Sequence, residues 1–191
     1  MREISLHLLD IAENSVAAGA RQVDLRVHED FHGDRLWAMV KDDGRGMSPD
    51  MLAAVADPFT TSRTTRKVGL GIPLLKAAAE ACNGSLTIDS LPGQGTCVEV
   101  TFQHSHIDRM PLGDIAGTIL TLVVAYPDIR WLYRHTVSFP GDTGRNQFDF
   151  DNQPIMEALG DLSLSEPDVL AYLRNLLEDG VAGVRRPVLV S

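Results

Sequence analysis

The strongest constraint on the fold is an alternation of helical and strand patterns in the first hundred residues. Apolar residues follow helical spacing over residues 4–16. Apolar and polar residues then alternate around Leu25 and Ala38, which predicts two strands. A second helix is predicted over residues 71–83, and a hairpin over residues 86–102. Helices that alternate with antiparallel strand pairs predict an α/β fold, a two-layer α/β sandwich.

The composition excludes several classes of protein. The chain has 191 residues, of which 44% are hydrophobic and 23% charged, so it can bury a core. The apolar stretch between Gly117 and Pro127 is too short to span a bilayer, and no signal peptide is predicted. A net charge of −9 argues against non-specific binding to nucleic acid. Cys82 and Cys97 are interpreted as reduced thiols, and we expect a cytoplasmic protein that binds neither nucleic acid nor membrane.

The chain changes character near residue 104, which predicts a division into residues 1–104 and 105–191. All three lysines lie in the first part. The second part is predicted to form a small α+β domain, or an extension that packs on the first part. Its predicted elements are a helix over residues 111–125, strands over 129–137 and 147–151, and a helix over 165–180.

The first candidate site lies on the opening helix. Asp10 and Asn14 are one turn apart and share a side of the helix, with Glu13 beside them. A carboxylate and a carboxamide placed in this way suit a hard metal ion and a polarised water molecule. The simpler interpretation is the solvated face of an amphipathic helix.

Two further candidates are rich in glycine. Asp42 ends an apolar strand and is followed by Gly44 and Gly46, an arrangement that lets a flat ligand approach the backbone while a carboxylate accepts hydrogen bonds. The alternative is a tight turn. Gly69 and Gly71 open a helix whose exposed amides suit a polyphosphate, and the preceding hydroxyl-rich and cationic loop is either a phosphate cover or an ordinary surface loop.

Two patterns remain open at this stage. The segment Gly93-Gln94-Gly95-Thr96 is, by itself, a hairpin turn. His104, His106 and Asp108 follow the last predicted strand of the first part. If the strand continued, the two histidines would share a face and could bind zinc or iron, whereas polar residues at a junction are the simpler interpretation.

In this order and spacing, the motifs of residues 1–104 resemble the GHKL superfamily. That group includes DNA gyrase, the ninety-kilodalton heat-shock chaperones, histidine kinases and MutL. The stretch ENSVAAGARQVDLRV is most similar to MutL, whereas DPFTTS and the segment from GLGIPLL to CVEVTF resemble a histidine-kinase catalytic domain. The resemblance implies a Bergerat-type ATP-binding fold that binds ATP with Mg²⁺.

The resemblance also implies a role for individual residues. Asn14 would coordinate the Mg²⁺ ion of the nucleotide, and Asp10 would activate the attacking water. Asp42 would bind the exocyclic amine of adenine, with Thr96 supporting it through water. The other ATP-binding residues that it implies are Gly44, Gly46 and Met47 near the base, Thr61, Arg66 and Lys67 in a lid over residues 60–68, and Gly69, Leu70 and Gly71 at the phosphates.

Three departures from the family pattern shape the functional expectation. Asp10 is one methylene shorter than the usual glutamate, the lid has only about nine residues, and no phosphoacceptor histidine module is visible. We expect an Mg-ATP-binding protein that hydrolyses ATP slowly or transfers phosphate to a partner protein, which residues 105–191 would contact. The alternatives are a serine kinase and binding partner of the anti-sigma-factor type, and a non-catalytic ATP-gated switch.

Overall fold

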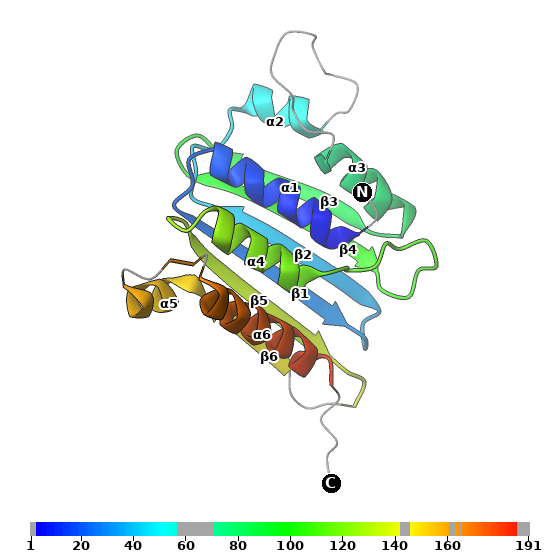
Figure 1. Ribbon diagram of the computed structural model, residues 1–191. Helices are drawn as coiled ribbons and strands as arrows, with labels where there is room; N and C mark the ends of the chain where they lie inside the picture. The colour runs from blue at the N-terminus through cyan, green and yellow to red at the C-terminus, as the bar shows by residue number, and fades with distance from the viewer. Residues whose placement is uncertain (1–2, 57–70, 142–145, 161–162, 165, 187–191) are drawn as a thin grey trace.

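The computed structural model describes residues 3–56, 71–141, 146–160, 163–164 and 166–186. They form a six-stranded sheet in the order β3-β4-β2-β1-β5-β6, with helices packed on one face (Figure 1). In chain order the elements are α1 (Ile4–Ala17), β1 (Gln22–Asp30), β2 (Arg35–Asp42), α2 (Pro49–Ala56), α3 (Gly71–Ala81), β3 (Ser85–Leu91), β4 (Gly95–Gln103), α4 (Ile115–Ala125), β5 (Arg130–Ser138), β6 (Asn146–Asp151), α5 (Asn152–Leu159) and α6 (Pro167–Val184). The predicted two-layer α/β sandwich is confirmed.

The second half of the chain extends the same sheet. β1 pairs antiparallel with β2 and parallel with β5, and β6 then pairs antiparallel with β5. Parallel strands need a crossover connection, and α4 lies within the one that joins β4 to β5. Side chains from both halves share one apolar cluster between the sheet and the helices, including Leu8, Leu25, Trp131 and Leu177. The shared cluster makes residues after 104 part of the same two-layer packing.

Two helix boundaries and one short helix differ from the sequence prediction. The helix predicted from residue 111 begins at Ile115, because Asp114 caps it by accepting a hydrogen bond from the Gly117 amide at 2.8 Å. The last helix continues past Gly180 to Val184, and a Cβ at Gly180 would lie 2.3 Å from the Phe148 ring. That glycine therefore permits close packing and does not end the helix. The short helix α5 was not predicted.

The histidine-rich segment after β4 does not continue the strand. β4 ends at Gln103, so the condition under which His104 and His106 would share a strand face is not met. The Asp108 amide instead donates to His106 Nδ1 at 3.2 Å, and His104 Nε2 lies 3.5 Å from a Glu29 carboxylate oxygen. Within the described ranges, no group of three or more His, Cys, Asp or Glu residues is placed to hold a metal ion.

The structure also describes the two cysteines and the character of the helices. Cys82 and Cys97 are free thiols, and burial raises the pKa of both. Of the helices that the structure describes, none combines the length and the apolar character that a membrane crossing requires.

A buried charged network fastens the end of the chain to the sheet. Glu29 on β1 is only 6% exposed, and its Oε1 accepts hydrogen bonds from His135 Nε2 at 2.9 Å and from Arg185 Nε at 2.7 Å. The Tyr133 hydroxyl lies 3.0 Å from His135 Nδ1. Burial raises the pKa of Glu29, but the two hydrogen bonds and the Arg185 charge outweigh it and hold that pKa at about 2. Because Arg185 directly follows α6, this network joins the last helix to β1 and β5.

The Glu29 network makes the fold sensitive to acid. The pKa of Glu29 is about 2 in the folded chain, below its ordinary value of 4.5. The stabilisation is therefore complete above about pH 5 and is lost as the pH falls towards about 2. We expect Glu29→Gln to lower the free energy of unfolding at pH 7 by about 3 kcal/mol and to flatten its decline in acid. Urea unfolding at pH 7 and in acid measures both effects, with Glu157→Gln on the exposed side of α5 as the control; equal acid sensitivity in Glu29→Gln would contradict this prediction.

Candidate functional site

The carboxylate of Asp42 is the centre of the candidate site. Asp42 ends β2 and is only 7% exposed. Its Oδ2 accepts a hydrogen bond from Ser15 Oγ at 2.7 Å, and its Oδ1 accepts from the amides of Gly44 at 2.9 Å and Thr96 at 3.2 Å. A carboxylate offers about four acceptor positions, so about one remains, on Oδ2. All three donors are neutral groups.

Strand register and helix packing bring these donors together. Asp42 lies directly opposite Thr96 in the β2–β4 pair, which places both side chains on one face. Ser15 comes from the buried side of α1 and is 3% exposed. The structure therefore brings the predicted residues Asp42, Gly44 and Thr96 together. Thr96 contacts Asp42 directly through its amide, and the predicted water-mediated support stays a prediction.

Two glycines let the loops beside Asp42 meet backbone to backbone. Gly46 has φ +63°, and a Cβ there would lie 2.0 Å from the Leu91 carbonyl oxygen. A Cβ at Gly95 would lie 1.9 Å from the Asp42 carbonyl oxygen. The Gly93 amide also donates to the Arg45 carbonyl at 2.7 Å. The glycine pattern that predicted close approach to a ligand therefore has a structural reason of its own.

Sequence reasoning missed the hydroxyls that hold this site, those of Ser15 and Ser90. Ser90 Oγ accepts from the Met47 amide at 2.9 Å, lies 3.0 Å from the Gly95 carbonyl oxygen and lies 2.9 Å from Thr96 Oγ1. Met47 is predicted to lie near the adenine base, and Ser90 connects its loop to the β3–β4 turn. The hairpin spacing places Ser90 opposite Thr96, and that register is the signal that would have found it.

A second group of predicted residues lies where α1 meets the start of α3. Asp10 Oδ2 is buried and has no hydrogen-bond partner in the described part of the chain. A Cβ at Gly71, the first residue of α3, would lie 1.8 Å from that oxygen. A carboxylate at a helix N-terminus is favoured by the helix dipole. His7 lies in the same region, where burial lowers its pKa while a backbone hydrogen bond with Gly71 and the charge of Asp10 raise it.

The remaining predicted residues are exposed or fall outside the described ranges. Asn14 and Glu13 are exposed on α1. The predicted lid and most of the phosphate segment are not among the described residues, namely Thr61, Arg66, Lys67, Gly69 and Leu70. Their roles stay predictions.

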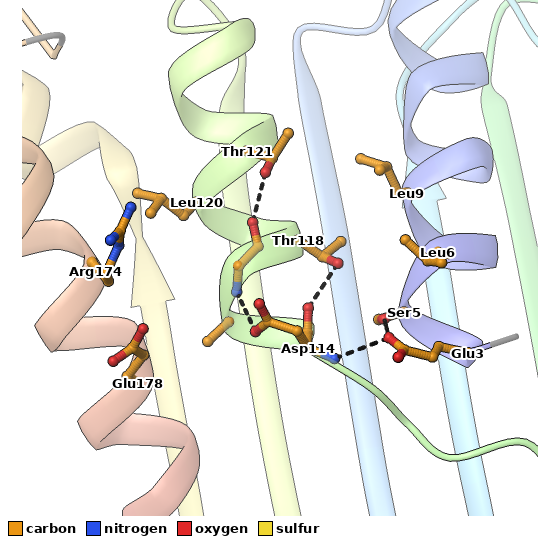
Figure 2. A pocket seen from close by; sticks show the side chains of 12 residues that line it. Glu3, Ser5, Leu6, Leu9, Asp114, Thr118, Leu120, Thr121, Arg174 and Glu178 are labelled. Atoms are coloured by element: carbon orange, nitrogen blue, oxygen red, sulfur yellow. Dashed lines mark hydrogen bonds between the residues drawn. The ribbon is translucent and has the colours of Figure 1, made fainter.

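Two hollows have different relations to these residues. A cavity of about 220 Å³ is lined by Asp42, Ser90, Thr96 and their neighbours. A groove of about 450 Å³ runs between α1, α4 and α6, and none of the predicted ATP-binding residues lines it. Figure 2 shows its walls, with Leu6 and Leu9 from α1 on one side and Leu120 from α4 beside Arg174 and Glu178 of α6.

Gly46 and Gly93 form a matched pair for testing the loop contact. Both have positive φ, but a Cβ at Gly93 would meet no atom within 4 Å, whereas one at Gly46 would meet the Leu91 backbone. We expect Gly93→Ala to cost about 1 kcal/mol of stability through φ alone. Gly46→Ala should cost about 1–3 kcal/mol more, because the backbone must move. Chemical unfolding measures both, and equal losses would show that the loops do not meet as described.

Comparisons with known proteins bear on the same region of the chain. The chain is 33% identical over 117 residues to the non-motile and phage-resistance protein of Caulobacter vibrioides, which covers 56% of this chain and 14% of that protein. It is 41% identical over 90 residues to the sensor protein kinase FleS of Pseudomonas aeruginosa, which covers 47% of this chain and 22% of that protein. The chain thus spans less than a quarter of the length of either relative.

A solved structure shares the fold of this chain, and a family model identifies its family. The crystal structure of the N-terminal domain of a DNA repair protein matches 97% of this chain and 57% of that chain, with a TM-score of 0.52 and 11% identity, a likeness of fold alone. The family model of the histidine kinase-, DNA gyrase B- and HSP90-like ATPases matches residues 2–106. That match includes β1 to β4, Asp10, Asp42 and Thr96. The chain therefore belongs to this family of ATPases, as the resemblance to the GHKL superfamily implies.

Proposed function

We propose that this chain binds Mg-ATP and recognises the adenine base at Asp42. The observation that carries the proposal is the buried Asp42 carboxylate, which neutral donors hold and which keeps about one acceptor position. The exocyclic amine of adenine is a donor that suits such a position. Family membership supports ATP binding, because the matching region contains Asp42, Gly46 and Thr96.

The residues on α1 fit a magnesium ion. Mg²⁺ prefers oxygen ligands, and Asn14 carries an exposed carboxamide one turn from Asp10. Asp10 Oδ2, which has no hydrogen-bond partner in the described ranges, adds a carboxylate oxygen on the same side of the helix as Asn14. When bound, the ion would offset the negative charge of the phosphates. We propose that Asn14 holds it.

We further propose that Asp10 acts as the general base. A base must reach the attacking water within about 2.6–3.2 Å, or through one further water. The side chain of Asp10 is shorter than that of glutamate, and its Oδ2 lies against Gly71. This placement supports slow hydrolysis of ATP, or transfer of phosphate to a partner protein.

A protein partner would contact residues 105–191, and the groove of α1, α4 and α6 is the surface that we propose for it. Its apolar walls include Leu6, which is 39% exposed, and Leu120. Carboxylates outnumber cations along it, with Glu3, Asp114 and Glu178 against Arg174. By charge complementarity, the fitting occupant is a segment of a partner protein that carries aliphatic side chains beside lysine or arginine.

Nucleotide binding tests the adenine and magnesium sites separately. Asp42→Asn should weaken ATP by about 1–3 kcal/mol, because the amide cannot accept as the carboxylate does. Asp43→Asn is the matched control, since Asp43 accepts from the amides of Arg21 and Gln22 instead. Asn14→Ala should weaken Mg-ATP far more than metal-free ATP. Titration calorimetry measures each affinity, and equal binding of GTP and ATP to the unaltered chain would remove the adenine assignment.

Turnover with γ-labelled ATP tests whether Asp10 is the general base. Asp10→Asn should abolish release or transfer of phosphate and leave ATP affinity nearly unchanged, because the lost interaction belongs to the transition state. Glu13→Gln is the control on the same helix, and Asp10→Glu restores the longer arm and should raise the rate.

Adding a cell lysate to the same reaction distinguishes the alternatives. Free phosphate indicates an ATPase, and a labelled partner indicates a kinase, including one of the serine-kinase type. If neither appears while ATP binds, the chain is an ATP-gated switch. A partner that is labelled equally by the Leu120→Asp variant would rule out the groove.

A further inference from the structure

Ser90, Thr96 and Asp42 form a row across three neighbouring strands. Thr96 on β4 lies directly opposite Ser90 on β3 and Asp42 on β2. Directly opposed residues in antiparallel strands share a face of the sheet, so all three side chains lie on the face that α1 covers. Ser90 is half-buried in this row, next to the proposed base-binding position but without a direct contact to Asp42 in the described hydrogen bonds.

The hydrogen bonds of Ser90 can be assigned by counting hydrogens. A serine hydroxyl has one hydrogen and two acceptor positions. The Met47 amide donates to Ser90 Oγ, and Ser90 Oγ donates to the Gly95 carbonyl oxygen at 3.0 Å. Its only hydrogen is then in use, so in the contact of 2.9 Å with Thr96 Oγ1 the threonine must be the donor. This assignment satisfies every hydrogen in the cluster.

The assignment fixes the polarity of Thr96. With its hydrogen directed at Ser90, Thr96 Oγ1 presents only lone pairs to any further partner. Asp42 is a carboxylate and likewise accepts only. The two side chains together form an acceptor-only surface, which attracts an amino group and repels a carbonyl group.

We propose that Ser90 is a specificity-determining positioning residue, which orients the Thr96 hydroxyl so that the site accepts a 6-aminopurine and rejects a 6-oxopurine. The inference rests on the proposed adenine site and adds the origin of its selectivity. In Ser90→Ala the Thr96 hydroxyl loses its acceptor and is free to turn and donate to a carbonyl. The Met47 amide also loses its acceptor, but that change affects both nucleotides alike. The ratio of the affinities for the 6-amino and the 6-oxo nucleotide therefore isolates the effect of the orientation of the Thr96 hydroxyl.

The experiment compares ATP with inosine triphosphate, which carries a carbonyl group in place of the 6-amine. Titration calorimetry gives both affinities for the unaltered chain and for Ser90→Ala. We expect the preference for ATP to fall about three- to tenfold in Ser90→Ala, as for the loss of one oriented hydrogen bond. Ser85→Ala is the matched control, because Ser85 and Thr101 form a similar hydroxyl pair at 3.2 Å on the same two strands and are exposed. It should leave the preference unchanged, and Ser90→Thr, which keeps the hydroxyl, should preserve most of it.

Each result has a separate meaning. If Ser90→Ala weakens both nucleotides equally, or changes neither, Ser90 does not set the selectivity and the inference is overturned. If Ser90→Ala does not fold, Ser90→Cys replaces it, since a thiol of similar shape is a weaker hydrogen-bonding group and should also lower the ratio. If the unaltered chain shows no preference for ATP, the proposed adenine site itself fails.

Discussion

The parallel pairing of β1 with β5 is the contact on which the rest of the structure depends. β1 lies inside the sheet, and the crossover through α4 lays β5 beside it over the full length of the strand. The pairing draws the second half of the chain into the core of the first, where Trp131 is fully buried. It also places Glu29 and His135 on the covered face, so the charged end of β1 finds its partners only when the later elements are in place.

Two buried carboxylates lie at opposite ends of this face and are stabilised in different ways. Glu29 is held by His135 and Arg185, and the cationic partner offsets its charge. Asp42 is held by a serine hydroxyl and two backbone amides, which donate to both of its oxygens without offsetting its charge. A carboxylate that is paired with a cation attracts a ligand donor only weakly. A buried carboxylate without a cationic partner attracts a donor strongly. The difference explains why Glu29 serves stability and Asp42 is the candidate ligand group.

The sequence predicts those features that depend on local patterns. The strands around Leu25 and Ala38 follow from alternation, and the grouping of Asp42 and Gly44 with Thr96 follows from the resemblance to the GHKL superfamily. The roles of Ser15 and Ser90 depend on strand register and on how α1 crosses the sheet, which single-residue patterns do not contain. The contact between Glu29 and His135 joins residues 106 positions apart, beyond the reach of any local pattern. The length of α6 was underestimated because a glycine that serves packing resembles one that ends a helix.

The contact between Asp10 and Gly71 connects the two halves of the proposed site. A glycine at the start of α3 admits the Asp10 carboxylate, whose Oδ2 lies 1.8 Å from the position of a Cβ. The resemblance to the GHKL superfamily predicts that the phosphates bind at the same helix end. Phosphate and carboxylate are both anions and would repel each other at one helix N-terminus. A cation would offset this repulsion. Binding of the nucleotide as its magnesium complex is therefore favoured over binding of the free nucleotide. Asn14, one turn along α1, is exposed, which is consistent with its proposed role as a ligand of that ion.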